Sequence, residues 1–272
     1  MDRYCDFKKK LISLCEEEKQ IKSVLLVGSQ CREVCKADKY SDIDVVISCD
    51  APEKLLYENE WVNRLGKPIY SFVEDTIAGE KERRLLFEGS LDADLIVMTD
   101  ENLKRALSSH IVDEIMNRGY KLLFDRSSIT EYLNSIHTTE DAGYSPISES
   151  DFANLTNDFM FHTVWAEKKI KRGELWTAIM CINCYLKFKL LQIIEIYEHA
   201  VNGDDYDTWH CGRMIEQWAD ESITQELRGC FARYNSVELR TSLENTKKLF
   251  IRLSKVCAEK YGYTTGVSEI DR

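Results

Sequence analysis

The sequence predicts an α+β (α/β) protein in which a mixed β-sheet with flanking helices is followed by an α-helical bundle. Over residues 1–136, short apolar and β-branched runs alternate with helical segments, which is typical of a sheet covered by helices. Residues 137–150 (HTTEDAGYSPISES) contain Gly, Pro, Ser and Thr and few apolar side chains, which predicts a linker. Residues 151–272 are helical in pattern almost throughout, so we expect two domains.

The elements of the first domain follow from the period of its apolar residues. An amphipathic helix is expected first, over residues 3–19. Short apolar runs then predict strands at 21–28, 43–48, 68–74, 84–89 and 93–98. Helical segments are expected near 52–64 and 101–117.

In the second domain, the spacing predicts a helix over 151–172 that ends at Gly173. Residues at spacings of three and four predict its core stripe: Phe152, Leu155, Phe159, Thr163, Ala166 and Ile170. A second helix is expected over 174–200. The same pattern continues in three further segments, 206–219, 222–234 and 236–261.

Composition and charge restrict the class of partner. Among 272 residues there are 36 Lys and Arg but 47 Asp and Glu, a formal net charge of −11. Such a surface disfavours nucleic-acid backbones and favours a small polycation. We find no apolar run near the roughly 20 residues that span a bilayer, and no apolar signal-peptide core. We therefore expect a cytoplasmic protein with no nucleic-acid and no membrane partner. Its ten irregularly spaced cysteines fit a reducing compartment.

The segment VLLVGSQCREVCKADKYSDIDVVI at 24–47 holds the strongest chemical signal. Alternation along a strand places Asp42 and Asp44 on one face, about 7 Å apart along the backbone. Two such carboxylates are tolerable together when hard divalent cations lie between them. Gly28 lets the backbone approach a ligand closely, and Ser29 and nearby amides are suited to phosphate oxygens. The combination predicts a site for magnesium and a nucleoside triphosphate.

A third acid is expected from another strand. The segment DADLIV at 92–97 offers Asp94, next to the apolar run, and Asp92, one alternation earlier on the same face. A lone D-x-D pair is more often a solvated strand end. The Gly-Ser turn and the later acid favour catalysis, and no P-loop or G-x-G-x-x-G motif competes with them. Three such acids suit two-metal phosphoryl transfer.

These residues resemble the DNA polymerase β-type nucleotidyltransferase superfamily, through VGS at 27–29 and SDIDV at 41–45. More narrowly the chain is similar to the aminoglycoside 6-adenylyltransferases (streptomycin adenylyltransferases), with lincosamide nucleotidyltransferases as more distant relatives. The narrower resemblance rests on NEWVNRLGKPIYSFVED at 59–75, LLFEGSLDADLIV at 85–97 and KKIKRGELWTAI at 168–179. One departure is Gln30, where that family commonly has Arg.

The resemblance implies a nucleotidyltransferase sheet domain at 1–136 and a helical acceptor-binding domain at 151–272. It implies transfer of AMP from ATP to an acceptor hydroxyl, with release of pyrophosphate and with Mg²⁺, two ions being expected. The catalytic and metal-binding residues would be Asp42, Asp44 and Asp94. Gly28, Ser29 and Gln30 would contact the nucleotide.

A stripe on the helix at 151–172 suggests further contacts. Spacings of three and four place five residues on one face: Asp158, Phe161, Trp165, Lys168 and Arg172. The acid and the aromatics, together with Asp92, are candidates for acceptor binding, and the two cations for triphosphate binding. In the alternative interpretation the aromatics belong to the core and the cations to a solvated helix end. Arg83 and Arg84 are the alternative cations for the triphosphate.

The acceptor that fits an acidic protein best is a cationic aminoglycoside of the streptomycin type. Two other functions stay open. The same chemistry would serve a lincosamide, another metabolite or a protein side chain. A non-catalytic nucleotide-binding regulator would keep the fold without turnover. Whether the protein acts as a monomer or a homodimer is left open by the sequence.

Overall fold

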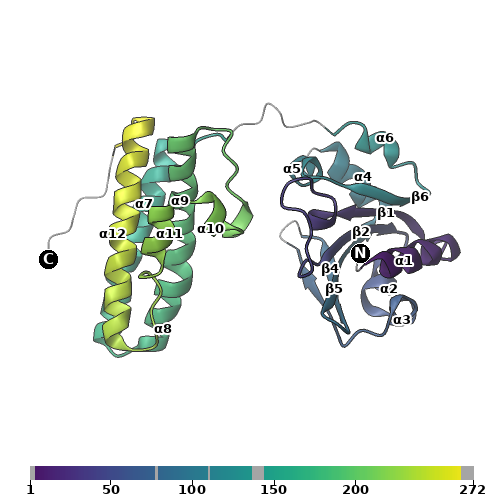
Figure 1. Cartoon of the computed structure of the whole chain (residues 1–272), viewed down its shortest axis with the longest axis horizontal. Helices are drawn as coiled ribbons and strands as arrows, with labels where there is room; N and C mark the ends of the chain where they lie inside the picture. Colours follow the sequence, from purple (N-terminus) through teal and green to yellow (C-terminus); the bar gives the residue numbers. More distant parts are fainter. Residues whose placement is uncertain (1–3, 77–78, 110, 137–143, 265–272) are drawn as a thin grey trace. The chain divides into compact units, whose positions relative to one another are not determined.

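The computed structural model describes residues 4–76, 79–109, 111–136 and 144–264. The chain divides into two compact units, Met1–Asp141 and Ala142–Arg272, and each is described by itself (Figure 1). Residues 137–143 of the expected linker lie outside the described residues.

The first unit is built on a six-stranded mixed sheet with the order β3-β4-β5-β2-β1-β6. Its strands are β1 (Ile21–Val27), β2 (Ile43–Cys49), β3 (Tyr70–Asp75), β4 (Lys81–Phe87), β5 (Leu91–Thr99) and β6 (Lys121–Asp125). The central strands β2 and β5 pair in parallel, and their neighbours pair antiparallel. The five predicted strands are confirmed. The short edge strand β6, which pairs with β1, was not predicted.

Helices cover both faces of this sheet because its central strands are apolar on both sides. One core includes buried side chains of α1 (Cys5–Glu17), α2 (Pro52–Tyr57) and α3 (Glu60–Leu65). The other includes side chains of α4 (Asp100–Ser108) and two shorter helices, α5 (Asp113–Asn117) and α6 (Thr130–Leu133). The expected helices over 52–64 and 101–117 are thus each broken into two, and α6 was not predicted.

The second unit consists of helices, as expected. They are α7 (Glu149–Lys171), α8 (Leu175–Met180), α9 (Leu186–Asn202), α10 (Ile215–Trp218), α11 (Glu221–Leu227) and α12 (Ser236–Tyr261). A π-helical turn, η3 (Cys181–Tyr185), interrupts the single helix expected over 174–200, and a 3₁₀ turn, η4 (His210–Gly212), precedes α10. The helices at 206–219 and 222–234 are shorter than predicted.

Local capping chemistry sets the ends of the long helices. The Ser148 hydroxyl accepts a hydrogen bond from the Asp151 amide, so α7 starts slightly earlier than expected. The Asn235 side chain caps α12 in the same way, and Gly262 ends it with φ +73°. The predicted core stripe of α7 is buried: Phe152, Leu155, Phe159, Thr163, Ala166 and Ile170.

One helical run contradicts the prediction that no apolar segment is long enough to span a bilayer. Leu175–Asn202 is long and apolar enough to cross a membrane by length and composition, with mean hydropathy 1.3 and 39% of its window buried. Core helices meet the same criterion. Its α9 portion packs against α7 and α12 and carries Lys187, Lys189, Glu195 and Glu198, so we interpret the run as a helix of the bundle that is buried on one side.

Candidate active site

Three carboxylates converge in the middle of the first unit's sheet. Asp42 precedes β2, Asp44 lies in β2, and Asp94 lies in the neighbouring strand β5. Each offers an oxygen within 4.8 Å of the others. Parallel pairing causes this, because Asp44 and Asp94 are register partners. Hard divalent cations take such oxygen ligands, so the donor set fits Mg²⁺.

Gly28 follows β1 directly and brings the backbone against this cluster. Its φ is +69°, and a Cβ built on it would lie 2.0 Å from Asp44 Oδ2. Both the left-handed backbone and the space therefore require glycine. The turn Gly28–Gln30 (η1) begins here, with Val27 opposite Asp44 in the sheet.

The two polar side chains of this turn, Ser29 and Gln30, differ in their hydrogen bonding. Ser29 Oγ is buried and has no hydrogen-bond partner among the described residues. A buried hydroxyl without a partner is costly, and a phosphate oxygen would satisfy it. Gln30 Nε2 instead donates to the Asp42 carbonyl oxygen at 3.1 Å. Gln30 therefore ties the turn to the acidic segment.

Asp94 is the most buried of the three acids, at 7% exposure. Burial raises its pKa to about 6; the Arg84 guanidinium opposes this shift, whereas Glu82 and Asp42 add to it. Arg84 is the cross-strand partner of Asp94, and its Nη1 lies 3.4 Å from Asp94 Oδ2.

Arg84 also contacts two further acids. Its Nε lies 2.5 Å from Glu74 Oε1, and its Nη2 lies 3.5 Å from Glu82 Oε2. The first contact is an ion pair without hydrogen-bond alignment, since Nε has no hydrogen-bond partner. Glu82 is buried, and burial raises the pKa of its carboxyl. Arg84 itself is 42% exposed, so its head remains accessible.

Arg83 is excluded from ligand binding by its contacts. It is 2% exposed, and its guanidinium donates to the carbonyls of Leu55 and Glu58, to Ser71 Oγ and to Asn59 Oδ1. These neutral acceptors take four of the five N–H donors of the guanidinium. Of the two adjacent arginines only Arg84 faces the acids.

Asp92, at the start of β5, is held by Tyr4, the residue that precedes α1. The Tyr4 hydroxyl donates to the Asp92 carbonyl at 2.9 Å and to the Ser41 carbonyl at 3.1 Å. It also lies 3.3 Å from Asp92 Oδ1. Tyr4 therefore links the two segments that carry the acids.

The predicted stripe of α7 lies in the second unit. Asp158 pairs with Lys189 at 2.9 Å and with His162 at 2.7 Å, and it accepts a hydrogen bond from the Tyr185 hydroxyl. Hydrogen bonds from Lys189 and Tyr185 lower its pKa despite some burial. A cationic acceptor at Asp158 would compete with Lys189.

The other members of this stripe are more accessible. Phe161 is 66% exposed, which contradicts the core interpretation for this ring, and Trp165 is partly buried. Lys168 is exposed. Arg172 is exposed and pairs with Glu174 at 2.6 Å.

Two acids near the site, Glu74 and Glu82, were not singled out from the sequence. The signal was present in KERRLLF at 81–87, where Glu82 and Arg84 alternate onto one strand face. Recognising it requires knowing that β4 lies beside β5 in the antiparallel register that opposes Arg84 to Asp94.

Several known proteins are similar to this chain. A family model described as streptomycin adenylyltransferase matches residues 1–271. An aminoglycoside 6-adenylyltransferase of Staphylococcus aureus is 22% identical over 252 residues, covering 85% of this chain and 86% of that protein. Among solved structures, an aminoglycoside 6-adenyltransferase from Bacillus subtilis is 16% identical, with a TM-score of 0.41. The match covers 95% of this chain and 90% of that protein. A nucleotidyltransferase-like protein from Exiguobacterium sibiricum is 8% identical, with a TM-score of 0.36, and the match covers 93% of this chain and 78% of that protein.

Gly28→Ala tests the close approach of the turn. We expect it to weaken Mn²⁺ binding, followed by electron paramagnetic resonance, by at least about tenfold, because the new methyl displaces the Asp44 carboxylate. Gly89→Ala is the matched control, since Gly89 has φ +72° and open space around its Cβ position. Equal effects of the two variants on metal binding would contradict this role of Gly28.

Asp94→Asn tests the electrostatic cost of the cluster. A carboxyl whose pKa is raised on folding destabilises the folded state above that pKa, and the penalty disappears below its unfolded value. We therefore expect the metal-free variant to be more stable than wild type at pH 7.5 by about 1–2 kcal/mol, with loss of the Arg84 contact limiting the gain.

The advantage of Asp94→Asn should vanish as pH falls from about 6 towards 4. Urea unfolding at several pH values measures it, with exposed Asp205→Asn as the charge control. A variant less stable than wild type at pH 7.5 would show that the Asp94 charge is not a net cost.

Proposed function

This chain belongs to the streptomycin adenylyltransferase family, and from that premise we propose that it transfers AMP from ATP to a hydroxyl of a cationic aminoglycoside. The family makes it a nucleotidyltransferase. Finer points are part of the proposal: a streptomycin-like acceptor, ATP as donor, Mg²⁺ as the metal and pyrophosphate as the product. We also propose a cytoplasmic enzyme that acts as a monomer or homodimer, without nucleic-acid or membrane partners.

The observation that carries this proposal is the convergence of Asp42, Asp44 and Asp94 beside the unpartnered Ser29 hydroxyl. The three carboxylates would hold one or two Mg²⁺ ions, which supply positive charge to the triphosphate and the developing transition state. Gly28 lets the backbone approach the phosphates, and Ser29 Oγ donates to a phosphate oxygen.

The reaction breaks one bond and forms one. The acceptor oxygen attacks the α-phosphorus, an O–P bond forms, and the bond to the pyrophosphate oxygen breaks. The proton of the acceptor hydroxyl must pass to a base. Asp94 is the candidate, because its pKa lies near 6 and it belongs to the cluster, although it is also a candidate metal ligand.

The triphosphate also requires cations from the protein, and the Gly-Ser turn carries Gln30 instead of Arg. In the first unit, the Arg84 guanidinium contacts Asp94 of the acid cluster. We therefore add Arg84 to the candidates Lys168 and Arg172 for triphosphate binding. Arg172 is paired with Glu174, which makes it the weakest of the three.

The acceptor is proposed from charge. Glu74, Glu82 and Asp92 lie around the three catalytic acids, and the chain carries a net charge of −11. Guanidinium and ammonium groups are recognised by such carboxylates. Asp158, Phe161 and Trp165 remain candidates for acceptor contacts from the second unit.

The decisive assay follows pyrophosphate release with Mg²⁺, ATP and a panel of aminoglycosides and lincosamides. We expect turnover with a streptomycin-like acceptor, and a loss of at least about 10³-fold in Asp42→Asn and Asp44→Asn. Turnover only with a lincosamide, another metabolite or a protein would keep the chemistry and replace the acceptor. Tight ATP binding without turnover on any acceptor would favour the regulatory function. Full activity in both variants would refute the mechanism.

Arg84→Gln is expected to raise the KM for ATP by about tenfold, through loss of a charged contact to the triphosphate. Lys168→Gln tests the second candidate under the same conditions. Arg64→Gln is the control, because Arg64 pairs with Glu17 and Glu18 on the outer helices of the same unit. Calorimetric titration with a non-hydrolysable ATP analogue separates binding from turnover. An unchanged analogue affinity in Arg84→Gln would remove Arg84 from the triphosphate site.

A further inference from the structure

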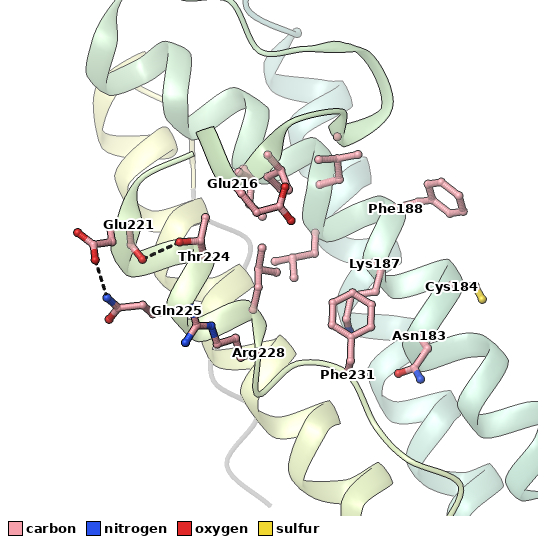
Figure 2. A pocket seen from close by; sticks show the side chains of 16 residues that line it. Asn183, Cys184, Lys187, Phe188, Glu216, Glu221, Thr224, Gln225, Arg228 and Phe231 are labelled. Atoms are coloured by element: carbon pink, nitrogen blue, oxygen red, sulfur yellow. Dashed lines mark hydrogen bonds between the residues drawn. The ribbon is translucent and has the colours of Figure 1, made fainter. Parts of the chain in front are cut away.

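The second unit contains a pocket of about 730 Å³ bordered by α9, η4, α10 and α11. Figure 2 shows the side chains that line it. This volume lies within the range of small-molecule sites. Apolar side chains dominate the walls, among them Leu190, Leu191, Ile194, Ile215 and Leu227.

Two aromatic rings of this pocket are exposed. Phe188 is 67% exposed and Phe231 is 56% exposed, although both line the pocket. The helical run that includes α9 is buried over only 39% of its apolar window. The unit therefore leaves apolar surface in a concave place, where a ligand would bury it.

Two cationic side chains, Lys187 and Arg228, line the pocket, and Lys187 is the one held against an aromatic ring. Lys187 Nζ donates to the Ile182 carbonyl at 3.0 Å and to Thr246 Oγ1 at 2.8 Å, and it lies 5.2 Å from the centre of the Phe231 ring. None of these partners carries a negative charge. Within the described part of the chain, no carboxylate lies within ion-pair distance of Nζ. An ammonium has three N–H donors, so one is left for a ligand.

The electrostatic state of Lys187 is consistent with an unpaired cation. Burial lowers its pKa to about 8, because the surroundings do not compensate the charge. An anionic group beside Nζ would supply this compensation. Two carboxylates line the pocket, Glu216 and Glu221, and neither forms an ion pair with Lys187 among the described residues. Glu221 Oε1 instead accepts a hydrogen bond from Gln225 Nε2 at 3.0 Å at the other side of the pocket, as Figure 2 shows.

The backbone is irregular on two sides of the pocket. The π-helical turn η3 contributes Asn183 and Cys184, and Gly212 of the η4 segment also lines it. Cys211 and Met214, which flank Gly212, adopt left-handed conformations with φ +54° and +56°. Such irregularities are enriched at functional sites.

We propose that this pocket is a second ligand site, which takes a small molecule with a flat apolar body and one anionic group. The anion binds Lys187, and the body packs against Leu191, Ile194 and the neighbouring apolar side chains. A polycationic aminoglycoside does not fit this chemistry, because Lys187 and Arg228 would repel it and most of the wall surface is apolar. The site is therefore separate from the proposed acceptor site and does not depend on it.

Two fluorescent probes that differ by one charged group test the proposal on the full chain. 8-Anilinonaphthalene-1-sulfonate carries the anion, and N-phenyl-1-naphthylamine has the same aromatic body without it. We expect saturable binding of the sulfonate with one site per chain, unaffected by saturating ATP and Mg²⁺. Lys187→Met should weaken its binding about tenfold and leave the neutral probe unchanged. Lys248→Met, an exposed lysine of α12, is the charge control and should change neither.

Leu191→Trp, which fills the pocket, should weaken both probes, with circular dichroism confirming the fold. If that variant does not fold, the comparison of Lys187→Met with Lys248→Met still shows whether the anionic probe binds beside Lys187. The proposal is overturned if the sulfonate probe does not saturate, if ATP displaces it, or if Lys187→Met affects both probes alike. It is also overturned if sedimentation shows a dimer that hides the pocket from both probes.

Discussion

The central constraint in the first unit is electrostatic: the sheet holds three carboxylates, with oxygens within 4.8 Å of one another, that repel each other. Parallel pairing of β2 and β5 fixes two of them as register partners, and the backbone of Gly28 approaches so closely that no side chain fits there. Without compensation such a cluster costs stability. Burial is the main cause of the raised pKa of Asp94, and the Glu82 and Asp42 carboxylates add to the shift. The sheet therefore gathers carboxylates whose repulsion a bound cation would relieve.

The surroundings of the cluster moderate this cost without removing it. Arg84 contacts Asp94 from β4 and is itself shared with Glu74 and Glu82, so a single cation faces several acids. Tyr4 fixes the backbone beside Asp92 by hydrogen bonds that carry no charge. The result is an acidic site bordered by Arg84, whose side chain is partly exposed. This arrangement suits a ligand that combines phosphate with bound metal, because Arg84 and the acids then find partners of opposite charge.

The second unit presents the opposite electrostatic problem. There an isolated ammonium, Lys187, lies in an apolar wall, whereas in the first unit several carboxylates crowd together. Both places leave a charge incompletely compensated, and each indicates the sign of the ligand that would complete it. The two sites are thus predicted to take ligands of different chemistry.

The sequence by itself determined the parts of this protein that depend on local pattern. The D-x-D pair, the Gly-Ser turn and the strand-borne Asp94 were readable as a candidate site, and the stripe of α7 was readable as core, because alternation and helical period are local properties. Only the tertiary structure decided that Arg84 meets the acids while its neighbour Arg83 is structural, since cross-strand register lies outside local pattern. It likewise decided that Asp158 pairs with Lys189 and that Lys187 faces a pocket, because these contacts join helices distant in sequence.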